Sequence, residues 1–225
     1  MRPAFAQQLV DLERRIVGHL AAAANTLATI AAAVRAPSAH RIGAIADDGR
    51  ALRSGANAIH TDLVVVAARQ TPVAGDLRLV VAMIDLAHHT GLIANQFGLI
   101  AGQLAEIDPD THDPSDAAEQ LAEMAAVASA QLRKATTAFS TRDLRTAREL
   151  DADDDRLDQL NRRIFELAAH AEGSSERLEL GMHCVLIARC LERIGDNAVD
   201  IAEQAAFLLT AELREFSDAS HPDRA

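Results

Sequence analysis

Two short acidic stretches hold the residues of this chain whose types and spacing could do chemistry. Their candidate metal ligands are Asp151, Asp154, Asp155, Asp158, Glu192 and Asp196. Residues four apart share one face of a helix, so Asp154 stacks with Asp158, and Glu192 with Asp196, about 6 Å apart. Water tolerates the resulting repulsion, whereas a partly buried face would need a cation or a basic partner.

A helical hairpin would bring the two stretches together. Gly173 suits the left-handed position after a helix, and Ser174 or Ser175 can cap the next helix. At a helical rise of about 1.5 Å per residue, the first stretch lies about 26 Å before this turn and the second about 31 Å after it. The two stretches are therefore level to within about one turn, and Asp200 and Glu203 follow one and two turns further along.

An all-oxygen cluster of this kind suits Mg²⁺, Mn²⁺, Ca²⁺ or iron better than a structural Zn²⁺ site, which prefers Cys and His. The spacing does not identify the metal. A simpler interpretation stays open, in which the carboxylates form a solvated helix face neutralised by surface ion pairs. The basic residues available for it are Arg156, Arg162, Arg163, Arg189 and Arg193.

The composition predicts an all-α protein. The 225 residues are 49% hydrophobic and only 3% aromatic, with no Trp or Tyr, which favours close packing of helices. A net charge of −11 argues against a nucleic-acid partner held through phosphates. Cys184, Cys190 and His183 are expected to be core residues. The start of the chain lacks the apolar segment of a signal peptide, and no run of about 18 apolar residues predicts a membrane span, so we expect a cytoplasmic protein.

Apolar periodicity and breaker residues predict six helices. The expected ranges are 5–34, 38–69, 76–106, 116–139, 143–172 and 175–216, with a tight turn at 70–76 and a cap at 140–143. The breaker-rich stretch 107–115 predicts a boundary near residue 111. The predicted organisation is therefore a three-helix bundle at 1–110, a second at 111–216 and a frayed tail at 217–225.

The sequences of the two halves indicate an internal repeat. An offset of 101 residues pairs Leu77 with Leu178, Ala87 with Ala188, Ile93 with Ile194 and Ile100 with Ile201. The apolar register is kept, but the charges are not, because Gly91 falls opposite Glu192 and Asn95 opposite Asp196. The halves are expected to share a fold and to differ in chemistry.

Three stretches resemble the PhoU family of cytoplasmic regulators of phosphate uptake. They are Asp154 to Asp158, the run Leu191-Glu192-Arg193-Ile194-Gly195-Asp196-Asn197-Ala198, and the turn Pro72-Val73-Ala74-Gly75-Asp76-Leu77-Arg78. The resemblance covers essentially the whole chain and implies two tandem three-helix bundles. It also implies metal ligation by Asp154, Asp158, Glu192 and Asp196, with Asp151 and Asp155 as further candidates and Fe, Mn, Mg or Zn as the metal.

The first half departs from the family pattern. Gly91 and Asn95 stand where the family has acidic residues, so one metal site is expected rather than two. A substitute site could come from His60, Asp85, His88 and His89, whose imidazoles would favour a metal that prefers nitrogen ligands. The more ordinary interpretation of these four residues is a solvated helix surface.

The resemblance implies a protein that acts by contact. Its expected partners are the ATPase of the phosphate ABC transporter and a sensor histidine kinase, with negative regulation when phosphate is plentiful. A homodimer is expected, as is membrane association only through partners. Two alternatives stay open: a metal-free structural adaptor and a carboxylate-bridged metalloenzyme. The sequence lacks the Glu-x-x-His pairs of di-iron bundles and any nucleophile with its base, so no enzyme activity is expected.

Overall fold

The computed structural model describes residues 3–107, 116–170 and 175–212, and these form helices joined by short connections. The helices are α1 (Pro3–Arg35), α2 (Ala39–Gln70), α3 (Ala74–Glu106), α4 (Asp116–Thr141), α5 (Leu144–Arg148), α6 (Leu150–Ala169) and α7 (Ser175–Thr210). The expectation of an all-α bundle is confirmed.

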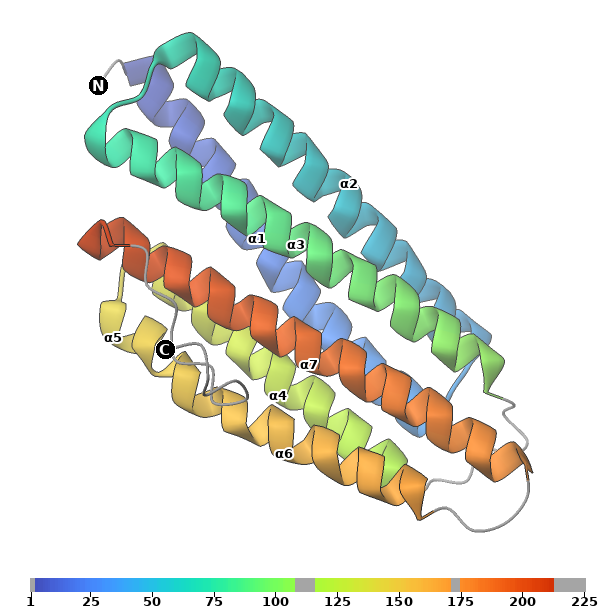
Figure 1. The fold of residues 1–225 in the computed structure, drawn as a ribbon. Helices are drawn as coiled ribbons and strands as arrows, with labels where there is room; N and C mark the ends of the chain where they lie inside the picture. The colour runs from blue at the N-terminus through green and yellow to red at the C-terminus, as the bar shows by residue number, and fades with distance from the viewer. Residues whose placement is uncertain (1–2, 108–115, 171–174, 213–225) are drawn as a thin grey trace.

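Six long helices lie side by side in two sets of three (Figure 1). α2 packs on α1 and α3, and α6 packs on α4 and α7, so α2 and α6 are the outer helices. The two sets meet where α1 packs on α4 and α3 packs on α7. α3 therefore touches α2 on one side and α7 on the other, which decides where its histidines point.

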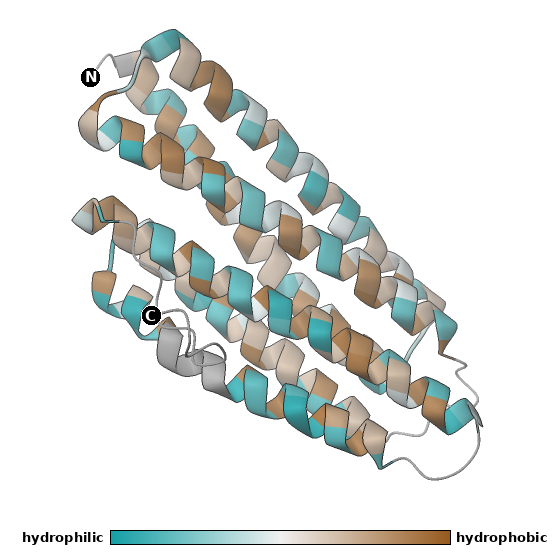
Figure 2. Ribbon diagram, viewed as in Figure 1, coloured by the Kyte–Doolittle hydropathy of each residue, from teal (hydrophilic) through white to brown (hydrophobic). Residues whose placement is uncertain are grey.

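The core follows from the apolar spacing along each helix. In α1, Ile16, Leu20, Leu27 and Ile30 are fully buried, as the helical period predicts. Figure 2 shows apolar and polar residues alternating along the helices in the way that amphipathic helices require. Buried apolar residues of both halves belong to one contiguous cluster. The division of the chain into bundles at 1–110 and 111–216 remains a prediction.

The internal repeat is visible in the burial of the paired positions. Ile93 and Ile194 are both fully buried, and so are Ile100 and Ile201. Leu77 and Leu178, by contrast, are both exposed. In these pairs, residues that lie 101 positions apart are therefore either both buried or both exposed.

Several helix ends match the expectation, and two do not. Ser38 caps α2 by accepting from the Arg41 amide, and Asp143 caps α5. The fifth predicted helix is divided at Glu149 into α5 and α6, although no Gly or Pro marks that point. The last helix ends at Thr210 rather than near residue 216, because Ala211 adopts a left-handed conformation with φ of 59°. The predicted boundary near residue 111, the turn at Gly173 and the tail lie outside the described residues.

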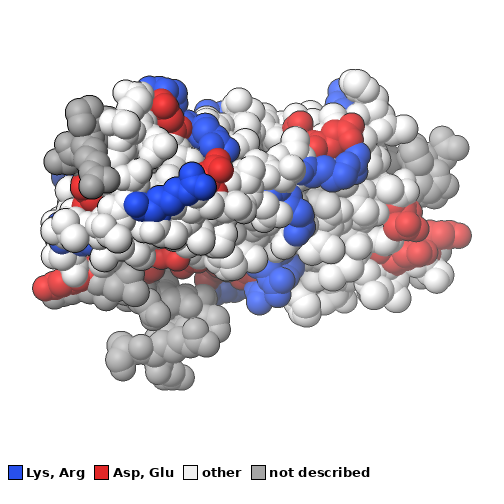
Figure 3. Space-filling model, turned by 90° about the horizontal axis from the view of Figure 1, so that it is seen from above, with Lys and Arg blue, Asp and Glu red and all other residues white. Residues whose placement is uncertain are grey.

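The face seen from above (Figure 3) shows no basic stripe, and the apolar helices do not give a simple membrane assignment. On the face in Figure 3, basic and acidic side chains are interspersed over a mainly uncharged surface. Two helices, Ala4–Arg35 and Ala74–Glu106, are long and apolar enough to cross a membrane, but their apolar windows are 50% and 44% buried inside the protein. This is weak evidence for membrane spans, because a helix in the core of a soluble protein can be equally long and apolar.

A half-buried histidine gives the fold a predictable response to acid. His19 on α1 faces Gly55 on α2, where an added Cβ would lie 2.3 Å from the imidazole. Burial, with a contribution from Arg15, lowers the pKa of His19 from 6.5. The unfolded chain therefore binds this proton more readily, and stability is lost as the pH falls through 6.5 toward the lowered pKa of the folded state.

We therefore expect His19→Gln to reduce the loss of stability between about pH 7.5 and about pH 5. The effect should be small, since the imidazole is only partly buried. Urea unfolding midpoints measured across this range check the expectation, with His40→Gln at an exposed position as the control. Identical pH profiles for the His19 variant and the wild type would contradict it.

Candidate metal site on the α6–α7 hairpin

The acidic residues of the described part of α6 and α7 lie on two helices that pack directly on each other. The close approach is set near Gly181, where an added Cβ would lie 3.4 Å from the Ala168 Cβ atom. Asp158 is buried on α6, and its carboxylate lies 3.6 Å from the guanidinium of Arg162. That arginine is one turn further along the same helix and largely exposed.

Glu192 on α7 is the second nearly buried carboxylate, with 13% of its side chain exposed. It forms an ion pair with Arg189 on the same helix, whose side chain is 58% exposed. Asp196 lies one turn further along and is exposed. These ion pairs are the ones that the solvated-face interpretation requires, although Asp158 and Glu192 are far less exposed than that interpretation expects.

The donor set partly fits a cation. Two nearly buried carboxylates whose basic partners lie mainly in water are costly to desolvate, and a bound cation would relieve that cost. Among the side chains that the structure describes, no group of three or more His, Cys, Asp or Glu is placed to hold a metal. The side chains of Asp151, Asp154 and Asp155 lie outside the described residues. The six-residue cluster therefore stays a prediction.

A polar contact across the two halves was not anticipated from the sequence. His89 Nδ1 lies 2.9 Å from Asn197 Oδ1 and 3.3 Å from Asp200 Oδ2. Asn197 Nδ2 donates to the Arg193 carbonyl, which leaves Oδ1 as the acceptor and assigns the proton to His89 Nδ1. This contact links α3 to α7 directly beside the second acidic stretch.

The proposed substitute site in the first half is not assembled. His60 and His88 line a hollow between α2 and α3, whereas Asp85 does not line it. His89 points to the other side of α3, toward α7, although its ring still touches that of His88 with centroids 5.6 Å apart. His88 and His89 point to different faces of α3 because positions 88 and 89 are about 100° apart around a helix.

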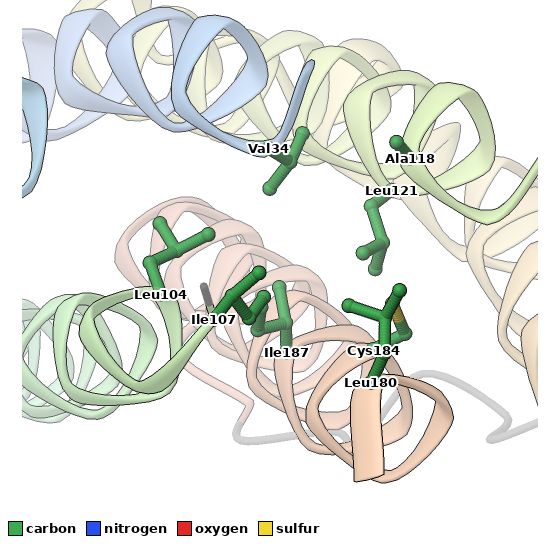
Figure 4. A pocket seen from close by; sticks show the side chains of 8 residues that line it. All are labelled: Val34, Leu104, Ile107, Ala118, Leu121, Leu180, Cys184 and Ile187. Carbon is green, nitrogen blue, oxygen red and sulfur yellow. The ribbon is translucent and has the colours of Figure 1, made fainter. Parts of the chain in front are cut away.

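The cysteines are core residues, as predicted. Cys184 lies in the apolar junction of α1, α3, α4 and α7 (Figure 4), around a void of about 10 Å³. Burial raises the pKa of the Cys184 thiol to about 11, which makes it a poor nucleophile. Burial also raises the pKa of Cys190. His183 was expected in the core as well, but it is half-buried, with Nδ1 lying 2.8 Å from Gln103 Oε1.

Comparison with known proteins gives this architecture a family. The family model described as the PhoU domain matches residues 121–205. The chain is 34% identical over 152 residues to the phosphate-specific transport system accessory protein PhoU homolog 1 of Methanothermobacter thermautotrophicus, covering 66% of this chain and 67% of that protein. It is 28% identical over 216 residues to PhoU homolog 2 of Mycobacterium tuberculosis, covering 93% and 98%.

Solved structures agree on the fold. The crystal structure of the phosphate transport system regulatory protein PhoU from Streptococcus pneumoniae matches with a TM-score of 0.81 at 22% identity, over 93% of this chain and 99% of that one. PhoU from Pseudomonas aeruginosa matches with a TM-score of 0.73 at 17% identity, over 93% and 97%. The fold and the site define an all-α bundle protein with an acidic helical hairpin. The chain belongs to the PhoU family.

Proposed function

We propose that this chain is a cytoplasmic accessory protein of a phosphate-specific transport system that acts by contact. The observation that carries the proposal is the 34% identity to a protein named for that role. The expected partners are the ATPase of the phosphate ABC transporter and a sensor histidine kinase. In this proposal the chain holds the kinase in its phosphatase state or its inactive state when phosphate is plentiful. It acts as a homodimer and reaches the membrane only through its partners.

Exposed apolar side chains on both halves support a role in contact. Phe165, Leu178 and Met182 are exposed on α6 and α7. Their repeat partners, 101 residues earlier, are also large, apolar and exposed: Val64, Leu77 and Val81. Such side chains are common at protein interfaces. Their recurrence at equivalent positions of the repeat fits a chain that offers similar surfaces to its partners.

The metal in this proposal has a structural task. Asp154, Asp158, Glu192 and Asp196 would hold it, with Asp151 and Asp155 as further candidates, and the metal would be Fe, Mn, Mg or Zn. A bound cation would neutralise the carboxylates and fix α6 against α7. No chemical step is assigned to it, and the chain is proposed to be a regulator rather than an enzyme.

The direct test is binding to the transporter ATPase from the same organism. We expect the purified chain to bind that subunit, and the double variant Phe165→Ser, Leu178→Ser to bind at least about tenfold more weakly, because apolar anchors dominate interface energies. Surface plasmon resonance measures both. Leu99→Ser, at an exposed apolar position on α3, is the control.

Two results would contradict the proposal. One is the absence of binding to both the ATPase and the histidine kinase at protein concentrations well above those in a cell. The other is equal weakening by the Leu99 control and the double variant, which would mean that the contact does not involve the exposed residues of α6 and α7.

A further inference from the structure

A hollow of about 310 Å³ lies between α2 and α3, away from the acidic hairpin. Its polar lining comes from Arg53, Asn57 and His60 on α2 and from His88 and Asn95 on α3. The α2 residues are spaced four and three apart, and the α3 residues seven apart, so each set lies on one face of its helix. The polar groups that line the hollow are thus held in fixed positions by two packed helices.

The hollow is open beside Gly91, near the middle of α3. Gly91 lines it, and a Cβ added there would meet nothing within 4 Å. Closer packing nearby is possible, since a Cβ at Gly49 would lie 3.2 Å from the Ala94 carbonyl oxygen. The space at Gly91 is therefore local and is not a general looseness between α2 and α3.

The lining is rich in hydrogen-bond donors and, among the residues that the structure describes, includes no carboxylate. Arg53 is its fixed positive charge, and within the described part of the chain no carboxylate pairs with it. The two imidazoles can each donate one hydrogen bond when neutral and two when protonated. Such a set disfavours a divalent cation and favours an anion, because a guanidinium forms strong bidentate bonds to oxyanions.

One lining atom narrows the choice of anion. Asn95 Oδ1 is buried and has no hydrogen-bond partner among the described residues. A buried acceptor without a donor is costly, and this cost would be relieved if the Asn95 amide turned toward the hollow and its oxygen accepted from a ligand hydroxyl. Hydrogen phosphate has both charged oxygens and one P–OH group at neutral pH, whereas sulfate has no O–H to donate.

We propose that the α2–α3 hollow is a binding site for hydrogen phosphate, with Arg53 as its principal contact. This inference goes beyond the accessory role and does not depend on it, because it concerns a small ligand and the isolated chain. Its failure would leave binding to the transporter ATPase untouched, and failure of that binding would leave the hollow untouched.

The test is calorimetric titration of inorganic phosphate into the purified, chelator-treated chain. We expect saturable binding of one phosphate, and at least tenfold weaker binding by Arg53→Gln. Arg69→Gln removes the same charge from the last turn of α2, outside the hollow, and should bind as the wild type does. Sulfate should bind measurably more weakly than phosphate.

A second variant fills the hollow without touching Arg53. Gly91→Glu places a carboxylate in the open space and should abolish binding, whereas Gly98→Glu adds the same charge at an open position on the same helix and should not. Circular dichroism checks that both variants remain helical. Phosphate binding unchanged by Arg53→Gln and Gly91→Glu, or no binding by the wild type, would overturn the site. Equal binding of sulfate would overturn the role given to Asn95.

Discussion

A Glu192→Ala, Asp196→Ala double variant is expected to be purified without bound metal, whereas the wild-type chain carries Fe, Mn, Mg or Zn in stoichiometric amount. The physical reason is the low exposure of the Glu192 carboxylate, together with that of Asp158 on the facing helix. The double variant removes both carboxylates that α7 would contribute to an all-oxygen site, and with them the charge that would hold a hard cation. Elemental mass spectrometry on protein prepared without added metal measures the difference.

The control for this experiment is chosen on the same helix. Glu176 and Glu179 are exposed on α7, so Glu176→Ala, Glu179→Ala makes the same change of charge away from the acidic hairpin. We expect this variant to keep its metal. If the wild type is empty even after metal is supplied, the carboxylates form a solvated face neutralised by Arg162 and Arg189, and the metal-free adaptor becomes the better description.

Most of the fold could be predicted because the helices carry their own signals. The apolar period of α1, the cap at Ser38 and the repeat offset of 101 residues all depend on residues close in sequence or on a regular pattern. The break at Glu149 could not be predicted, since Arg145 to Arg148 includes no helix breaker. The early end of α7 at Thr210 could not be predicted either, because the next residue, Ala211, favours a helix.

The candidate sites were less predictable because they depend on which helix faces which. Helical spacing placed Asp158 and Glu192 on neighbouring helices, and the structure confirms that these helices pack together. Spacing alone could not show that His88 faces α2 while His89 reaches Asn197 on α7. The significance of Arg53 was also hidden, because it depends on the space left by Gly91 across the helix interface.

Phe97→Ala and Phe139→Ala, one in each half, are each expected to lower the free energy of unfolding by about 3–5 kcal/mol. Both rings are fully buried, and both belong to the single core that joins the two sets of helices. Because that core is shared through α1 with α4 and α3 with α7, each variant should move one cooperative transition of the whole chain. Denaturant titration followed by circular dichroism, with calorimetry on the same samples, measures this.

Leu99→Ala provides the matched control, since Leu99 is exposed on the same helix as Phe97 and should change stability by no more than about 0.5 kcal/mol. Two separate transitions, with Phe97→Ala moving one and Phe139→Ala the other, would mean that residues 1–110 and 111–216 fold as independent bundles. A single transition moved by both variants would mean that the two halves unfold as one cooperative unit. In that case a ligand bound in one half would stabilise the other half as well, because any free energy gained by the folded state is shared by every part of a cooperative unit.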